Sequence, residues 1–153
     1  MDFLIEDPAL GLSAVCVPIL RTLPDWFGIE AAIRNYQQEI DGLATLLAKC
    51  GPEVIGFLSI KVHNVHSAEV YVMGVRPGMH RQGVGRGLVC RAEEFARDQG
   101  IEYLQVKTLG PSRHDQGYAR TRAFYSALGF RPLEEFQNIW DERNPCLVFV
   151  KRI

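Results

Sequence analysis

The sequence lacks a long apolar run, a basic leader and an excess of charge of either sign. No apolar stretch approaches the roughly 20 residues that a membrane-spanning helix needs. Residues 1–7 carry acidic rather than basic side chains, which argues against a secretory signal. Because the net charge is -1 and the pI is about 6.4, we expect no general attraction to nucleic acid or to an anionic membrane. These features predict a cytoplasmic protein whose partners include neither nucleic acid nor membrane.

The four cysteines form no recognisable metal or disulfide pattern. Cys16, Cys50, Cys90 and Cys146 include no C-x-x-C pair, and their spacing suits neither a zinc site nor a small disulfide framework. No nucleophile signature surrounds any of them. We therefore expect four reduced thiols and no metal.

Internal repeats, low-complexity segments and linkers are also missing. The chain has 153 residues, of which 47% are apolar and 23% are charged, and both shares are ordinary for a globular protein. A single domain over residues 1–153 is therefore expected.

The apolar residues predict an alternation of strands and helices. Residues 14–20 are apolar and contain Pro18, which predicts a first strand at the edge of a sheet. The other predicted elements are a helix over 29–40, strands over 43–49, 54–62 and 68–75, a helix over 84–100, a strand over 101–108, a helix over 119–128, and strands over 130–136 and 146–151. This order predicts a mixed α/β domain with a partly antiparallel and partly parallel sheet.

Residues 75–86 carry the most informative pattern. A predicted strand ends there, a glycine-rich turn containing Gly83 and Gly85 follows, and a helix begins. The start of a helix presents unpaired backbone N–H groups and partial positive charge, and glycine lets a phosphate approach the main chain closely. Arg81 and Arg86 add positive charge. The segment therefore predicts a binding site for a pyrophosphate or a similar anion, although a glycine-rich helix start without a ligand remains the alternative.

Other nucleotide-binding motifs fit this segment poorly. A Walker A loop needs Gly-Lys-Ser/Thr, which is absent. A dinucleotide-binding fingerprint needs a third glycine where Leu88 stands, within an N-terminal βαβ unit.

Two segments resemble signatures of the GNAT acetyltransferase superfamily. Residues 80–85, His-Arg-Gln-Gly-Val-Gly, resemble its acetyl-CoA-binding motif, Gln/Arg-x-x-Gly-x-Gly/Ala, with His80 as the departure. Residues 121–130, Thr-Arg-Ala-Phe-Tyr-Ser-Ala-Leu-Gly-Phe, resemble the second signature, a helix that carries a tyrosine and ends in Gly-Phe. The two segments occur in the expected order, separated by one predicted strand.

The resemblance implies a GNAT fold, with helices around a mixed, mostly antiparallel sheet in which one parallel pair splays apart. Acetyl-CoA would be the cosubstrate, and its pantetheine arm would lie in the splayed gap. The implied cofactor-binding residues are Met73, Gly74, Val75, Arg81, Gln82, Gly83, Val84, Gly85, Arg86 and Tyr125.

The resemblance also suggests two catalytic residues. Tyr125 is the candidate general acid, because a phenol can protonate or hydrogen-bond the leaving thiolate. Its alternative is a core tyrosine beside Phe124. Glu69, fourteen residues before Gly83, resembles the glutamate base of histone-acetylating members. Its alternative is a solvent-facing glutamate at a strand edge, with a water chain as the base.

Several other side chains are weaker candidates. The histidines His63, His66 and His114 are interpreted as solvated loop residues. The aromatic residues Trp26, Phe27, Tyr71 and Trp140 either line an acceptor pocket or pack the core, and the core is preferred. The acidic residues Glu134, Glu135, Asp141 and Glu142 either attract a cationic amine or form a solvated face.

These observations predict an N-acetyltransferase that moves the acetyl group of acetyl-CoA to a primary amine. The amine would attack directly in a ternary complex, and the N–H groups near Gly74 and Val75 would stabilise the oxyanion. The acceptor would be a small-molecule or peptide amine. The alternative is a non-catalytic module that binds acyl-CoA. The acceptor, the acyl group and the oligomeric state, including a homodimer, stay open.

Overall fold

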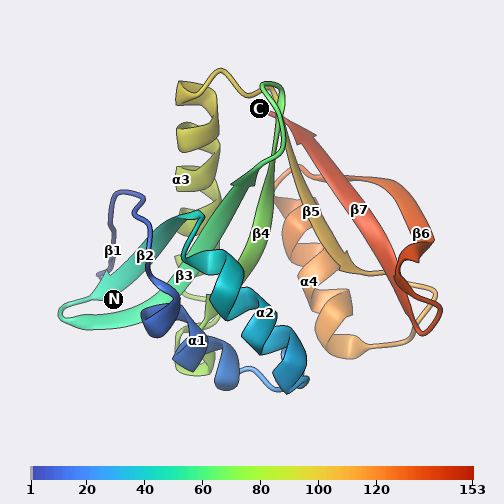
Figure 1. Cartoon of the computed structure of the whole chain (residues 1–153), viewed down its shortest axis with the longest axis horizontal. Helices are drawn as coiled ribbons and strands as arrows, with labels where there is room; N and C mark the ends of the chain where they lie inside the picture. The colour runs from blue at the N-terminus through green and yellow to red at the C-terminus, as the bar shows by residue number, and fades with distance from the viewer. Residues whose placement is uncertain (1) are drawn as a thin grey trace. The chain divides into compact units, whose positions relative to one another are not determined.

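The computed structural model describes residues 2–153 (Figure 1). The elements are β1 (Leu4–Ile5), α1 (Ser13–Arg21), α2 (Glu30–Ile40), β2 (Ala44–Cys50), β3 (Glu53–Val62), β4 (Ser67–Val75), the 3₁₀ turn η1 (Pro77–Met79), α3 (Val84–Asp98), β5 (Tyr103–Leu109), α4 (Gln116–Ala127), β6 (Arg131–Asp141) and β7 (Asn144–Arg152). The strands are hydrogen-bonded in the order β1-β2-β3-β4-β5-β7-β6. The predicted mixed α/β fold is confirmed, and the sheet is mostly antiparallel.

The chain divides into two compact units. The first contains the residues up to Lys61 together with Val70–Phe95, and the second contains Val62–Glu69 and Ala96–Ile153. The expectation of one domain over 1–153 stays a prediction.

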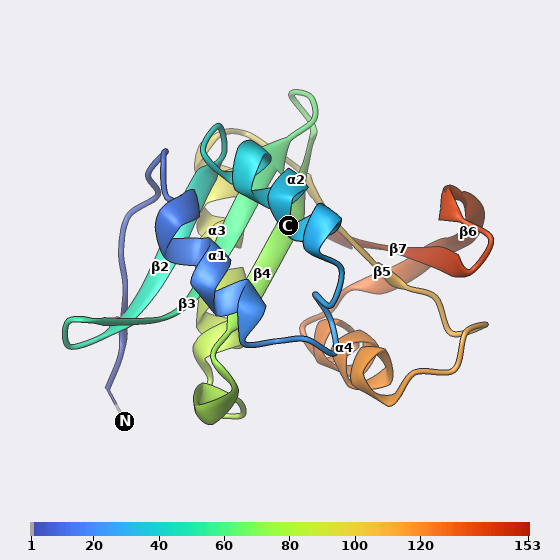
Figure 2. The same cartoon turned by 60° about the horizontal axis from the view of Figure 1, so that its bottom comes forward.

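The first unit is built on strands β1 to β4. Strands β2 and β3 form the predicted antiparallel hairpin, and Gly51 turns it with a φ of 59°. Helices α1 and α2 cover one face of these strands and α3 covers the other (Figure 2). Contacts at two glycines identify the two faces. A methyl group added at Gly74 would meet Ile19 of α1 and Leu23, which follows that helix, whereas one added at Gly56 would meet Val84 of α3.

Helix α1 corrects the sequence-based prediction, because residues 14–20 were expected to form an edge strand. Cys16, Ile19 and Leu20 are fully buried, which is the spacing of one helical face. Pro18 lies inside the helix and removes the hydrogen bond that the Ala14 carbonyl would accept. Both Pro18 and Ala14 are exposed, so water can satisfy that carbonyl. Burial of the apolar face therefore outweighs the local cost of the proline.

The second unit contains an antiparallel sheet in the order β5-β7-β6, with α4 against β5. Asp115 is the N-cap of α4, because its carboxylate accepts a hydrogen bond from the Tyr118 amide at 3.0 Å. Gly129, with a φ of 94°, follows the end of α4, as glycine often does after a helix. Strand β6 extends to Asp141, beyond the predicted end at residue 136.

The first residues of β4 also belong to the second unit, where they lie beside β5. Gln105 donates a hydrogen bond to Ser67 at 3.1 Å, and Lys107 donates one to Glu69 at 3.0 Å. Both members of these pairs advance by two residues in the same direction, which is the register of parallel strands. The predicted parallel pair is therefore β4 and β5.

Candidate functional site

The glycine-rich turn presents a run of free backbone amides. Among residues 2–153, no acceptor pairs with the N–H groups of Arg81 to Arg86, and the first helical hydrogen bond runs from the Gly87 amide to the Gly83 carbonyl at 2.9 Å. Arg81 and Gly83 have positive φ angles of 61° and 84°. Successive amides in such a conformation form a concave anion-binding site at a helix N-terminus.

The space and charge around this turn suit an anion. A methyl group added at Gly83 would meet no atom within 4 Å, so the main chain is open to a ligand there. The first turn of α3 carries no acidic side chain. Arg81 and Arg86 are exposed, and neither forms an ion pair within the described part of the chain. Both guanidinium groups therefore remain available to a phosphate.

His80, the departure from the usual motif, has a structural contact in the turn. Its Nε2 donates a hydrogen bond to the Val75 carbonyl at 2.7 Å, and its ring meets Trp26 edge-on with centroids 6.3 Å apart. Gln82 donates from Nε2 to the Gly78 carbonyl at 3.3 Å. These side chains hold the turn against the end of β4, while the amides from Arg81 onward stay free.

The end of β4 contains the backbone groups expected to meet pantetheine. Gly74 is buried, and a methyl group there would lie 3.2 Å from Phe57 and 3.3 Å from Ile19 and Leu23. A side chain at this position would therefore require small shifts of these neighbouring side chains. The expected pairing of Met73, Gly74 and Val75 with a cofactor stays a prediction.

Tyr125 of α4 has a buried ring and an accessible hydroxyl. Its ring packs against Phe124, Phe130 and Phe149, and the residue is 4% exposed. Within residues 2–153 its hydroxyl has no hydrogen-bond partner, and no fully buried polar side-chain atom is left unpaired, so this hydroxyl must contact solvent. Burial raises the pKa of Tyr125, and the phenol therefore keeps its proton at neutral pH. The ring of Tyr125 thus packs in the core, as the alternative interpretation proposed, while its hydroxyl is not used in that packing.

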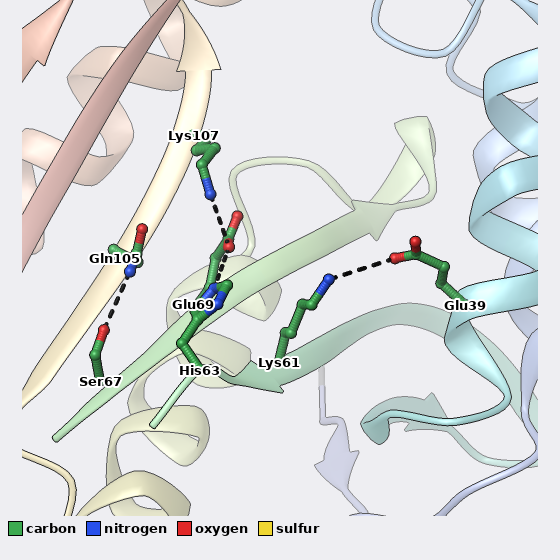
Figure 3. A network of polar contacts seen from close by, with 7 residues as sticks. All are labelled: Glu39, Lys61, His63, Ser67, Glu69, Gln105 and Lys107. Atoms are coloured by element: carbon green, nitrogen blue, oxygen red, sulfur yellow. Dashed lines mark hydrogen bonds and ion pairs between the residues drawn. The ribbon is translucent and has the colours of Figure 1, made fainter. Parts of the chain in front are cut away.

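Glu69 lies at the centre of a polar cluster in the second unit (Figure 3). Its residue exposure is 4%, so the solvent-facing alternative was wrong. Its Oε1 accepts hydrogen bonds from His63 Nε2 at 2.6 Å and from Lys107 Nζ at 3.0 Å. His63 is an exposed loop residue, as interpreted from the sequence, and its imidazole is in addition paired with this buried carboxylate.

Lys107 was missed by the sequence analysis, and His63 was undervalued. Lys107 lies on β5, 38 residues from Glu69, and only the parallel pairing of β4 with β5 brings the two together. The signal available in the sequence was alternation: Gln105 and Lys107 are polar residues between buried Leu104, Val106 and Thr108. This pattern predicts one polar face on an otherwise buried strand.

All four cysteines are free thiols, as expected. Burial, and then the negative charge of Asp41, raise the pKa of Cys16 to about 12. Burial also raises the pKa of Cys146 to about 11, with Lys107 lowering it and Glu69 raising it. Both thiols therefore stay protonated at neutral pH, unlike a reactive thiolate. No group of side chains suited to a metal ion occurs in residues 2–153.

The remaining candidates divide between packing and surface roles. Trp26, Phe27 and Tyr71 are half-buried and pack against the core of the first unit, whereas Trp140 is 47% exposed. His66 is exposed and pairs with Glu102 at 2.9 Å, and His114 is exposed.

The acidic candidates lie on β6 and in the turn that joins β6 to β7 in the second unit. Asp141 accepts hydrogen bonds from the Arg143 and Asn144 amides and so closes the turn between β6 and β7. The Glu135 carboxylate accepts a hydrogen bond from the Ser112 hydroxyl, while Glu134 and Glu142 are exposed.

Comparison with known protein families identifies the family of this chain. The model of the acetyltransferase (GNAT) family matches residues 19–130, a range that includes β4, the free amides and Tyr125. This chain belongs to the GNAT family. The match also includes the last three residues of α1, 19–21, and, in the second unit, Val62–Glu69 and residues 96–130. No helix in residues 2–153 is long and apolar enough to cross a membrane.

Relatives of this GNAT chain include two curated proteins named mycothiol acetyltransferase. The one from Beutenbergia cavernae is 35% identical over 74 residues, which are 48% of this chain and 23% of that protein. The one from Salinispora tropica is 27% identical over 131 residues, which are 82% of this chain and 41% of that protein. The chain therefore spans less than half the length of these relatives.

A solved structure supports the fold. A GNAT family acetyltransferase from Elizabethkingia anophelis with acetyl-CoA bound superposes with a TM-score of 0.76 at 16% identity, covering 99% of this chain and 98% of that one.

Proposed function

We propose that this GNAT chain transfers the acetyl group of acetyl-CoA to a primary amine. The observation that carries the proposal is the run of unpaired amides from Arg81 to Arg86. It lies within the family match and has two free arginines and open space at Gly83 beside it. These features fit the pyrophosphate of coenzyme A, the moiety that this motif binds in the family.

Each step of the proposed reaction has a group assigned to it. Acetyl-CoA and the amine are bound together, and the amine, once deprotonated, attacks the thioester carbon directly. The N–H groups of Gly74 and Val75 stabilise the oxyanion. Tyr125, whose raised pKa keeps its hydroxyl protonated, donates a hydrogen bond to the departing thiolate. Glu69 supports removal of the proton from the amine.

A small-molecule acceptor is favoured over a peptide. The curated relatives matched at 27% and 35% identity are named mycothiol acetyltransferase, a name that refers to mycothiol and to no peptide or protein. A purified sample should therefore release free CoA when acetyl-CoA is mixed with a panel of small amines. Peptides with free α-amines or lysines are the comparison set. Release with peptides alone would contradict the small-molecule assignment.

The alternative is a module that binds acyl-CoA without catalysis. Calorimetry with acetyl-CoA and thiol release with the amine panel separate the two. Tight binding with no amine-dependent thiol release would support the non-catalytic module and overturn the enzymatic proposal.

A further inference from the structure

A histidine–glutamate pair closes the turn between β3 and β4. His63 Nε2 lies 2.6 Å from Glu69 Oε1, and the exposed fractions of the two side chains are 30% and 5%. The carboxylate is thus shielded from solvent, while part of the imidazole remains accessible. We propose that His63 is the proton acceptor for the amine and that Glu69 orients and electrostatically supports the imidazole. This inference rests on the proposed acetyl transfer.

The contact determines which ring nitrogen is free. A carboxylate oxygen accepts hydrogen bonds, so the His63 nitrogen facing it, Nε2, carries the hydrogen. In the neutral ring Nδ1 then keeps its lone pair and serves as the basic atom. The ammonium N–H bond breaks, the proton forms a new bond to Nδ1, and the electron pair stays on the amine nitrogen. The resulting imidazolium is balanced by the Glu69 carboxylate.

Lys107 makes Glu69 better suited to this supporting role than to accepting the proton itself. Its ammonium group donates to Oε1 at 3.0 Å, the same oxygen that His63 contacts. The two hydrogen bonds to Oε1 fix the position of the carboxylate, and the ammonium group places a positive charge beside it. Lys107 is therefore a positioning residue, which holds the carboxylate toward the imidazole from β5.

The other groups around the carboxylate are a lysine, a thiol, an uncharged pair of side chains and a second lysine that pairs elsewhere. Lys107 faces it from β5, and Cys146 of β7 interacts with both Glu69 and Lys107. Burial raises the pKa of Cys146 to about 11, so its thiol stays neutral. The neighbouring Ser67–Gln105 pair is uncharged. Lys61, two residues before His63, pairs with Glu39 at 3.9 Å (Figure 3). Histidine is the side chain whose protonation normally changes between pH 5 and 8.

The first test needs no catalysis. Nitrogen-15 NMR of the imidazoles, with His63 assigned from the spectrum of His63→Gln, reports which ring nitrogen carries the hydrogen. We expect the neutral His63 ring to be protonated at Nε2, and this preference to weaken in Glu69→Gln. His66 is the matched control because it pairs with Glu102 through Nδ1 in an exposed setting. A hydrogen on Nδ1 of the neutral His63 ring would overturn the proposal.

The second test is the pH profile of kcat/KM. A glutamine at position 63 can still donate to Glu69 but has no basic nitrogen. We expect His63→Gln to lower kcat/KM about 10²-fold near neutral pH, with a deficit that shrinks as pH approaches the pKa of the amine. His66→Gln should leave the profile unchanged. Glu69→Gln should show the same pH-dependent deficit, because the imidazolium loses its balancing charge.

The outcomes separate the two levels of the proposal. A profile of His63→Gln that overlays wild type, or that is lower by a constant factor at all pH values, would overturn the proton-acceptor role. In that case wild type would still release CoA, and acetyl transfer would stand. If wild type releases no CoA with any amine, the proposed function fails and the role of His63 fails with it, whatever its tautomer.

Discussion

At the scale of single residues, Tyr125 combines two features that the sequence analysis treated as alternatives, a ring packed in the core and a hydroxyl available to a ligand. Its ring belongs to the aromatic packing of the second unit, and its hydroxyl is left without a partner among residues 2–153. A core tyrosine usually satisfies its hydroxyl with a hydrogen bond. The unpaired hydroxyl is therefore the part of Tyr125 that invites a functional test.

Tyr125→Phe should remove the hydroxyl without disturbing the packing. Because this hydroxyl has no partner within the described residues, the free energy of unfolding should change little. If it serves the leaving thiolate, kcat should fall by roughly 10²-fold with little change in KM for acetyl-CoA. Steady-state kinetics and a denaturant melt measure both quantities. Unchanged kinetics would assign Tyr125 to packing alone, and a change confined to KM would make it a binding residue.

At the scale of the elements, the start of α3 and the start of α4 use their free amides differently. At α4 the amide of Tyr118 is satisfied by the carboxylate of Asp115. At α3 the amides of Arg81 to Arg86 have no such partner in the described chain. The N-terminal amides of α4 are therefore partly satisfied within the chain, whereas those at the start of α3 are available to a ligand.

Gly85→Val should block the anion site while leaving α3 intact. Gly85 is not among the residues with positive φ, so its backbone tolerates a side chain, but a branched one would crowd the approach to the free amides. We expect calorimetry to show at least a tenfold loss of CoA affinity. Gly42→Val is the matched control, because a methyl group there meets only the Glu39 carbonyl at an ordinary 3.7 Å. Unchanged affinity in a folded Gly85→Val protein would place the pyrophosphate elsewhere.

Asp115→Ala should destabilise α4 by removing its cap. Loss of the carboxylate that accepts from the Tyr118 amide should lower the free energy of unfolding by about 1 kcal/mol. The control is Asp25→Ala, because Asp25 is exposed and has no hydrogen bond or ion pair within residues 2–153. This substitution should change the free energy of unfolding by less than about 0.5 kcal/mol. Urea denaturation compares the two variants. Equal stabilities would show that the Asp115 carboxylate contributes no net capping energy.

At the scale of the whole molecule, cofactor binding should be visible as stabilisation. A ligand that binds only the folded chain adds about 2.7 kcal/mol at a concentration of 100 times its Kd. For a chain of 153 residues this corresponds to an increase in Tm of roughly 5 to 10 °C. Thermal melts with and without CoA test this. The increase should be much smaller in Gly85→Val at the same CoA concentration, and equal increases in both proteins would contradict the site.

The sequence by itself determined most of the elements and the local part of the site. Periodicity located α2, α3 and the β2–β3 hairpin, because each buries a regular face that its own residues define. The glycine-rich turn could be recognised because an anion site made of main-chain amides depends on local backbone conformation. Gly83 and its neighbours encode that conformation within a few residues.

Tertiary structure alone decided the helix at Ser13–Arg21 and the environment of Glu69. Residues 14–20 are apolar enough for a strand or a helix, and packing of Cys16, Ile19 and Leu20 on one buried face selected the helix despite Pro18. The sequence placed Glu69 on a strand but not its partners. Lys107 reaches it only because β5 returns parallel to β4, and a contact between residues so far apart follows from strand pairing rather than from local pattern.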